Sequence, residues 1–128
     1  MIPGVPRAEW EVELPVDNRL VVDENQIPTG EEEPPGFRSG ALEDRSLDDG
    51  YSMPDRPRPF TVSGAGRTLG LEFLEGYTHA QVFAPPGKDL ICFEPMTAPG
   101  NALRSHEGLR LAPPGEPFTA AFRITVDG

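Results

Sequence analysis

The sequence predicts an all-β protein built mostly from antiparallel strands, and two observations carry that prediction. Short apolar runs alternate with polar residues along much of the chain, as expected of half-buried strands. Sixteen prolines and fourteen glycines are spread over 128 residues, and no stretch of about a dozen residues lacks both while also having helical apolar spacing. We therefore expect no long helix. The length suits one domain, or part of one, with a modest two-layer core.

The alternation is clearest at residues 9–14, where Trp10, Val12 and Leu14 would share one face of a strand and three glutamates the other. The final strand is expected over 118–126, with apolar residues at strict period two. The remaining expected strands are 19–22, 60–63, 67–74, 80–84 and 90–93.

The connections between these runs are also informative. Gly64-Ala65-Gly66 separates two strand-like runs, which predicts a β-hairpin whose glycines adopt positive φ. Residues 23–40 are rich in proline, glycine and glutamate, and we expect them to form a long surface excursion.

The charge and the cysteine content exclude some classes of function. A net charge of −10 argues against nucleic acid and anionic membrane surfaces as partners. No apolar run approaches 18 residues and no secretory signal is recognisable, so we expect a soluble cytoplasmic protein without membrane contact. Cys92 is the only cysteine and lies in an apolar run, which favours an inert buried thiol over a nucleophile.

The segment around Glu94 has the strongest functional pattern. The apolar run 90–93 leads directly into this glutamate, and Pro95, Pro99 and Gly100 follow it. These residues predict a strand that breaks into a fixed loop at Glu94. A carboxylate held in that position can be aimed at a ligand, although a solvated loop acid is the simpler interpretation of a glutamate before proline.

Residues 93–103 resemble the catalytic-glutamate motif of the aldose 1-epimerases (galactose mutarotases), in which a strand ends in Glu-Pro and a loop with proline and asparagine follows. Further similarities to this family occur in the family's order and extend from about residue 5 to the end of the chain. They lie at residues 26–31, 47–51, 81–87 and 111–116.

The resemblance implies a fold, an activity and a site. Residues 1–128 would form the C-terminal portion of the family's large antiparallel two-sheet sandwich. The activity would interconvert the α and β anomers of a free hexose, without metal or other cofactor. Glu94 would be the general base and Asp48 would accept a hydrogen bond from a sugar hydroxyl, with Asp49 as the alternative. The resemblance also places Gln81 and Asn101 among the substrate-binding residues.

The chain departs from the family pattern in its histidines. The family's general acid lies upstream in a His-Pro-Tyr-type motif, whereas this chain has only His79 and His106, which we expect at the surface. Residues 3–6 resemble a stretch that comes shortly after that motif, so the chain resembles a C-terminal half. We expect it to be a poor epimerase alone, and to form a homodimer or bind a complementing N-terminal half.

Three alternatives stay open at this point. The chain could be a non-catalytic carbohydrate-binding or structural β-module derived from the same family. It could instead be related to hexose-6-phosphate epimerases, but those would need an arginine cluster for phosphate, and no cluster stands out. At the level of local structure, Asp48-Asp49-Gly50 could be a plain Asx turn.

Overall fold

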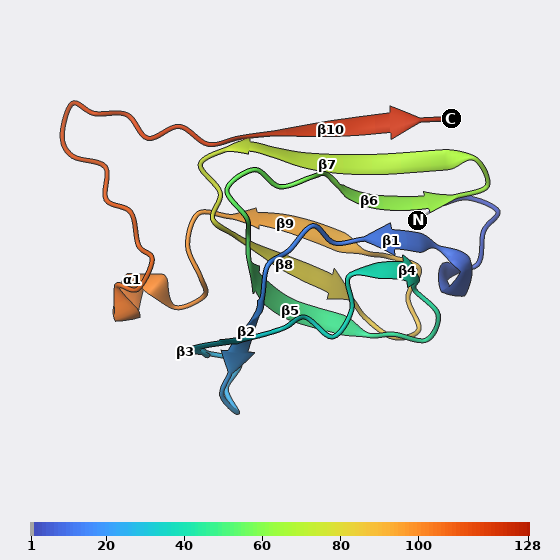
Figure 1. The fold of residues 1–128 in the computed structure, drawn as a ribbon, viewed down its shortest axis with the longest axis horizontal. Coiled ribbons are helices and arrows are strands. Elements are labelled where there is room, and N and C mark those ends of the chain that lie inside the picture. The colour runs from blue at the N-terminus through green and yellow to red at the C-terminus, as the bar shows by residue number, and fades with distance from the viewer. Residues whose placement is uncertain (1) are drawn as a thin grey trace.

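The computed structural model describes residues 2–128 and shows two stacked antiparallel β-sheets with very little helix (Figure 1). The all-β prediction is confirmed. The strands are β1 (Glu11–Glu13), β2 (Arg19–Val22), β3 (Pro28–Glu33), β4 (Ser39–Ala41), β5 (Leu47–Ser52), β6 (Phe60–Gly64), β7 (Arg67–Glu75), β8 (His79–Ala84), β9 (Cys92–Met96) and β10 (Ala121–Asp127). A 3₁₀ turn at Arg7–Glu9 and one short helix, α1 (Ala102–Ser105), complete the described elements.

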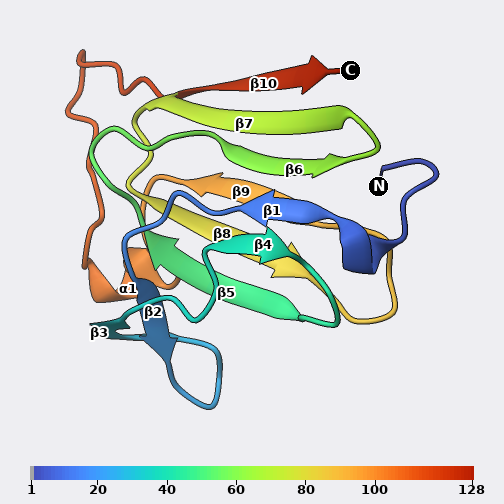
Figure 2. The same ribbon diagram turned by 45° about the vertical axis from the view of Figure 1, so that its right-hand side comes forward.

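Each sheet has five strands. The first sheet has the order β10-β7-β6-β1-β4, and the second has the order β3-β2-β5-β8-β9. Consecutive strands pair as hairpins in both sheets, and β1 pairs with both β4 and β6. The chain therefore moves between the two layers more than once, and Figure 2 shows the layers from a second direction.

The core fills the space between the two sheets. Trp10, Val12 and Leu14 are all buried, which confirms the alternation expected over residues 9–14. The Trp10 indole N–H donates to the Val5 carbonyl at 3.1 Å, so its one polar atom is satisfied. The fully buried Phe60 ring lies 5.2 Å from the ring of Phe93, which joins the first sheet to the second. Burial of such aromatic side chains supplies much of the hydrophobic stabilisation.

The β6–β7 hairpin is confirmed, but the two residues of its turn are Ala65 and Gly66, whereas positive φ was expected at the glycines. Ala65 and Gly66 adopt positive φ values of 49° and 75°, while Gly64 is the last residue of β6. Two consecutive left-handed residues form the turn whose twist matches antiparallel strands. An alanine therefore occupies a conformation that usually favours glycine or asparagine.

Strand boundaries around the expected site differ from the sequence prediction. Strand β9 begins at Cys92 and continues through Glu94 and Pro95 to Met96, so the strand does not break at Glu94. Proline is tolerated there because β9 is the edge of its sheet, where a missing N–H does not interrupt the ladder.

Two other segments are more regular than expected. Asp48-Asp49-Gly50 lies inside β5, so the interpretation as an Asx turn is wrong. These residues have low strand propensity, but Leu47 and Tyr51 at either side are buried and hold the segment in the sheet. The excursion expected over residues 23–40 is largely exposed, yet it contains β3.

The N-terminal turn is tied to the second sheet by Arg7. Its guanidinium donates to the Arg45 carbonyl at 2.7 Å and to the Ala84 carbonyl at 3.2 Å. Across residues 2–128, no helix has the length and apolar character needed to cross a membrane.

Candidate functional site

The candidate site lies on the outer face of the second sheet, where β5, β8 and β9 run side by side (Figure 1). Gln81 of β8 is paired with Gly50 of β5 on one side and with Glu94 of β9 on the other. Residues directly opposite one another on antiparallel strands point to the same face. The neighbours of Gln81 along β8, Ala80 and Val82, are fully buried in the core. Gln81 and Glu94 therefore share the face that points away from the core.

Gln81 and Asp48 are joined directly. The side-chain amide of Gln81 donates to Asp48 Oδ1 at 2.8 Å, and this bond passes beside Gly50, the residue opposite Gln81. A Cβ atom on Gly50 would lie 3.2 Å from Gln81 Oε1 and 3.3 Å from Leu20 Cδ1. The glycine thus leaves the space that the Gln81 side chain uses. The structure brings Asp48, Gln81 and Glu94 onto one polar face.

Glu94 differs from expectation in its surroundings. It is an exposed residue in the middle of an edge strand, whereas the sequence predicts a carboxylate at the point where the strand breaks into a loop. Strand alternation explains the difference: Phe93 turns inward to Phe60, so Glu94 turns outward. Cys92, expected to be buried, is likewise only partly buried. An exposed carboxylate can still accept a proton or a hydrogen bond from a ligand at this face.

Asp49 has a different position from Asp48. It alternates with Asp48 along β5 and shares the side of Leu47 and Tyr51. Its carboxylate accepts from Arg19 at 3.5 Å, and Arg19 also pairs with Glu33. Burial, and then the neighbouring Asp49 carboxylate, raise the pKa of the Tyr51 phenol well above its usual value. Asp49 therefore belongs to an ion-pair group at β2, β3 and β5, apart from Gln81.

Asn101 also lies apart from the other expected binding residues. It is exposed, precedes α1 and adopts a positive φ of 64°. It contributes to an open hollow of about 570 Å³ formed by the loop after β9, together with Pro95, Thr97 and Leu103. Asn101 makes no side-chain hydrogen bond to Asp48, Gln81 or Glu94 within the described residues.

His79 lies on the candidate face and was expected only as a surface residue. It is two positions before Gln81 on β8, opposite Met96, and it borders a small hollow with Leu20, Glu32 and Glu107. Partial burial lowers the pKa of its imidazole, and Glu32 acts in the opposite direction. The period-two spacing of His79, Gln81 and Phe83 is the signal in the sequence that could have placed it on this face.

The imidazole of His79 is held by its neighbour Thr78. The Thr78 hydroxyl lies within hydrogen-bonding distance of the Thr97 carbonyl, at 3.1 Å, and of His79 Nδ1, at 2.8 Å. The contact at Nδ1 restrains the orientation of the ring on the candidate face.

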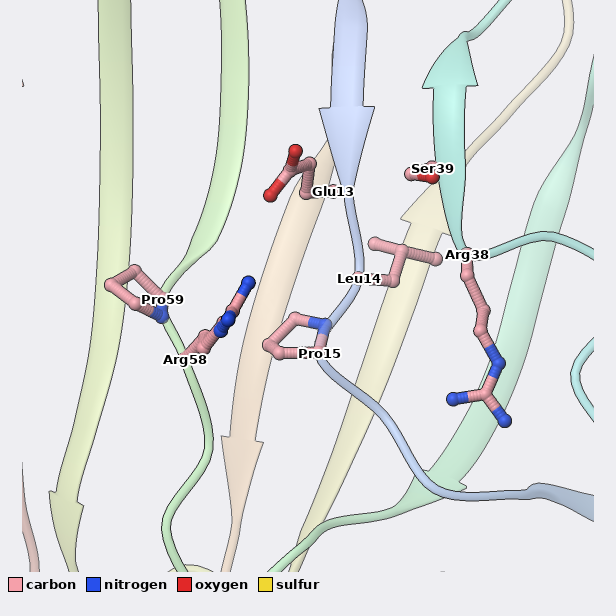
Figure 3. A pocket seen from close by; sticks show the side chains of 7 residues that line it. All are labelled: Glu13, Leu14, Pro15, Arg38, Ser39, Arg58 and Pro59. Atoms are coloured by element: carbon pink, nitrogen blue, oxygen red, sulfur yellow. The ribbon is translucent and has the colours of Figure 1, made fainter.

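A third hollow, of about 270 Å³, lies between β1 and the segment before β6, in the first sheet (Figure 3). Arg38 and Arg58 both line it, which could suggest an anion site. The Arg38 guanidinium, however, donates to the backbone carbonyls of Val16 at 2.6 Å and Asp17 at 2.9 Å. In Figure 3 it points away from Arg58. The two arginines do not form the cluster that phosphate recognition would require.

No metal site is formed within residues 2–128, since no three His, Cys, Asp or Glu side chains are grouped to hold an ion. The polar groups of the candidate face are instead two carboxylates, an amide and the His79 imidazole, which suit hydrogen bonding to hydroxyl groups.

Comparison with known proteins decides the fold. No family model and no curated protein matches this sequence. Among solved structures, the crystal structure of a galactose mutarotase-like protein from Clostridium acetobutylicum matches with a TM-score of 0.84 at 20% sequence identity. The match covers 98% of this chain and 44% of that one. The chain has a galactose mutarotase-like fold.

The fold expected from the sequence motifs is thereby confirmed. The 128 residues span less than half the length of the galactose mutarotase-like protein that they match. The match covers 98% of this chain, so the galactose mutarotase-like fold includes both of its sheets.

Proposed function

We propose that these residues form part of an aldose 1-epimerase-like protein that binds a free hexose on the outer face of β5, β8 and β9. The observation that carries the proposal is the grouping of Asp48, Gln81 and Glu94 on that face, with the Gln81–Asp48 hydrogen bond at 2.8 Å. The galactose mutarotase-like fold supports the same assignment. No metal or other cofactor is required for this reaction.

Each residue has a defined task in the proposed reaction. Glu94 accepts the proton of the anomeric hydroxyl, which lets the pyranose ring open. Asp48 accepts a hydrogen bond from another hydroxyl, and its bond to Gln81 fixes the direction of its carboxylate. Gln81 keeps a carbonyl oxygen and a second N–H for the sugar. Reclosure of the ring on the other face of the carbonyl gives the second anomer.

A second group must protonate the ring oxygen. The family resemblance assigns that role to a histidine upstream of the segment that this chain resembles. Turnover therefore requires a longer protein in which the 128 residues are joined to that part of the fold. The isolated chain is expected to bind a hexose weakly and to show little catalysis above the spontaneous rate.

Polarimetry on the longer protein tests the proposal. Glu94→Gln keeps the size and hydrogen-bonding capacity of the side chain but removes the base, so the catalysed rate should fall by roughly 100- to 10,000-fold. Hexose affinity should change little. Glu75→Gln, on an exposed glutamate at the end of β7 in the other sheet, is the matched control and should keep full activity.

The outcomes separate the candidate functions. A Glu94→Gln protein that turns over within a few fold of its parent would show that the base lies elsewhere. Hexose binding without turnover in the parent would indicate a carbohydrate-binding module.

A further inference from the structure

The first sheet extends beyond the edge of the second. Strand β9 is the last strand of the second sheet, and its Phe93 ring contacts Phe60 of β6. Strands β7 and β10 follow β6 in the first sheet, and in both views they continue past β9 (Figures 1 and 2). The inner face of β10 therefore has no second-sheet strand opposite it.

That inner face is apolar and exposed. Phe122, Ile124 and Val126 pair with Phe73, Leu71 and Leu69 of β7, which all contact or belong to the core. Residues paired in this way share a face. Yet Phe122 is 47% exposed, Ile124 65% and Val126 67%. Soluble monomers rarely expose a contiguous row of apolar side chains. Such a row marks a surface to which another polypeptide segment binds.

A hollow of about 340 Å³ separates this row from β9. It is lined by side chains of both sheets, including Leu71, Ile91, Phe93, Phe122 and Ile124. The free edge of β9 lies along the same opening, because within residues 2–128 β9 pairs with β8 alone. An unpaired edge beside an apolar face is a ready site for the addition of a strand. Pro95 lacks an N–H, so the added ladder would be short at that end of β9.

We propose that this groove is the docking site for an extended segment from outside these 128 residues, which adds to the edge of β9 and covers the inner face of β10. The matched galactose mutarotase-like protein supports this, since more than half of its chain has no counterpart here. The chemistry of the segment follows from the groove. The segment needs to be about as long as β9, which has five residues. Every second residue should be apolar and face β10, and the residues between them should be polar.

A second copy of this chain does not suit the groove. If two copies paired their β9 edges antiparallel, both first sheets would lie on the same side, and the overhanging β7 and β10 of each copy would enter the space taken by the first sheet of the other. Each copy also carries a net charge of −10, which opposes self-association at low ionic strength. The sequence left two partners open, a second copy and a complementing segment. We propose the complementing segment. This proposal does not depend on the proposed sugar chemistry.

Sedimentation and hydrogen exchange test the proposal on the 128-residue chain. The probe is a synthetic seven-residue peptide that alternates isoleucine or valine with lysine or threonine; a peptide of identical composition in non-alternating order is its control. We expect a monomer whose backbone amides in β9 and β10 gain protection with the alternating peptide only. Ile124→Lys should weaken that binding by about tenfold or more, because it would bury a charge in the groove.

The matched control is Thr125→Lys, which adds the same charge to the opposite face of β10 and should leave peptide binding unchanged. A dimer that Ile124→Lys dissociates would overturn the proposal in favour of a second copy. A folded monomer that shows no protection with the peptide would overturn it outright. Protection that is equal for the two peptides would also contradict a strand-specific groove.

Discussion

Gln81 reaches across Gly50 and donates its side-chain amide to Asp48 Oδ1 at 2.8 Å. This bond links two strands of the second sheet through side chains as well as through the backbone ladder. Glu94 lies opposite Gln81 on β9, the other neighbour of β8, so Gln81 stands between the strands that carry the two carboxylates. The hydrogen bond to Gln81 orients the Asp48 carboxylate, although both side chains are accessible to solvent.

Gly50→Ala should disturb this face without unfolding the protein. The new methyl group would lie 3.2 Å from Gln81 Oε1 and 3.3 Å from Leu20 Cδ1, so the Gln81 side chain must shift. We expect a several-fold loss of hexose affinity and a change in stability of no more than about 1 kcal/mol, measured by titration and by chemical denaturation. Gly36→Ala, where no atom lies within 4 Å, is the control and should leave affinity unchanged.

The two neighbouring aspartates should behave differently. Asp48→Asn weakens the site, because the carboxylate that Gln81 orients is lost, and hexose affinity should fall about tenfold. Asp49→Asn should leave affinity unchanged but lower the raised pKa of Tyr51, since the Asp49 charge contributes to that shift after burial. Absorbance titration of the tyrosinate reports the second effect. The reverse pattern would assign the sugar contact to Asp49.

Phe60 is the residue whose truncation should cost most in the core. Its ring lies 5.2 Å from both Phe73 and Phe93 and is fully buried. Phe60→Ala should lower the free energy of unfolding by about 3–5 kcal/mol, and Phe60→Leu by clearly less. Urea denaturation measures both. Equal, small losses in the two variants would mean that Phe60 does not join the sheets as described.

His79 gives the fold a pH dependence. Partial burial lowers the pKa of its imidazole below the ordinary value of about 6.5. Between the folded pKa and the ordinary value, the unfolded chain therefore binds the proton more readily than the folded protein does. Stability should therefore fall as the pH falls from above 6.5 towards the folded pKa. His79→Gln should lose less stability over that interval than the parent, measured by denaturation at pH 7.5 and 5.5. An identical loss in both proteins would show that other groups carry the effect.

Much of the fold could be predicted from the sequence because its signals are local. The alternation at Trp10, Val12 and Leu14, and the glycines near Ala65, are period-two and turn signals that act within a few residues. Strand β5 could not be predicted, since its Asp-Asp-Gly segment lacks strand propensity and is held in the sheet by pairing with β2 and β8.

The site could be predicted only in part, because its geometry also depends on pairing between strands. The residue types at Asp48, Gln81 and Glu94 were identified by resemblance, but which side chains share a face depends on register between strands. Register places Asp48 beside Gln81 and turns Asp49 towards Arg19. His79, Gln81 and Phe83 share a face through their period-two spacing along β8, but the register decides which side chains of β5 and β9 join them there.

A hexose titration followed by NMR tests the central claim, that a sugar binds at this face, most directly. With galactose or glucose added to the ¹⁵N-labelled 128-residue chain, the account predicts shifts of the Gln81 side-chain amide and of backbone amides near Asp48 and Glu94. Gly50→Ala should reduce these shifts, and residues of the hollow lined by Arg58 should not respond. Shifts confined to the hollow at Arg58, or no shifts at all from the folded protein, would contradict the account.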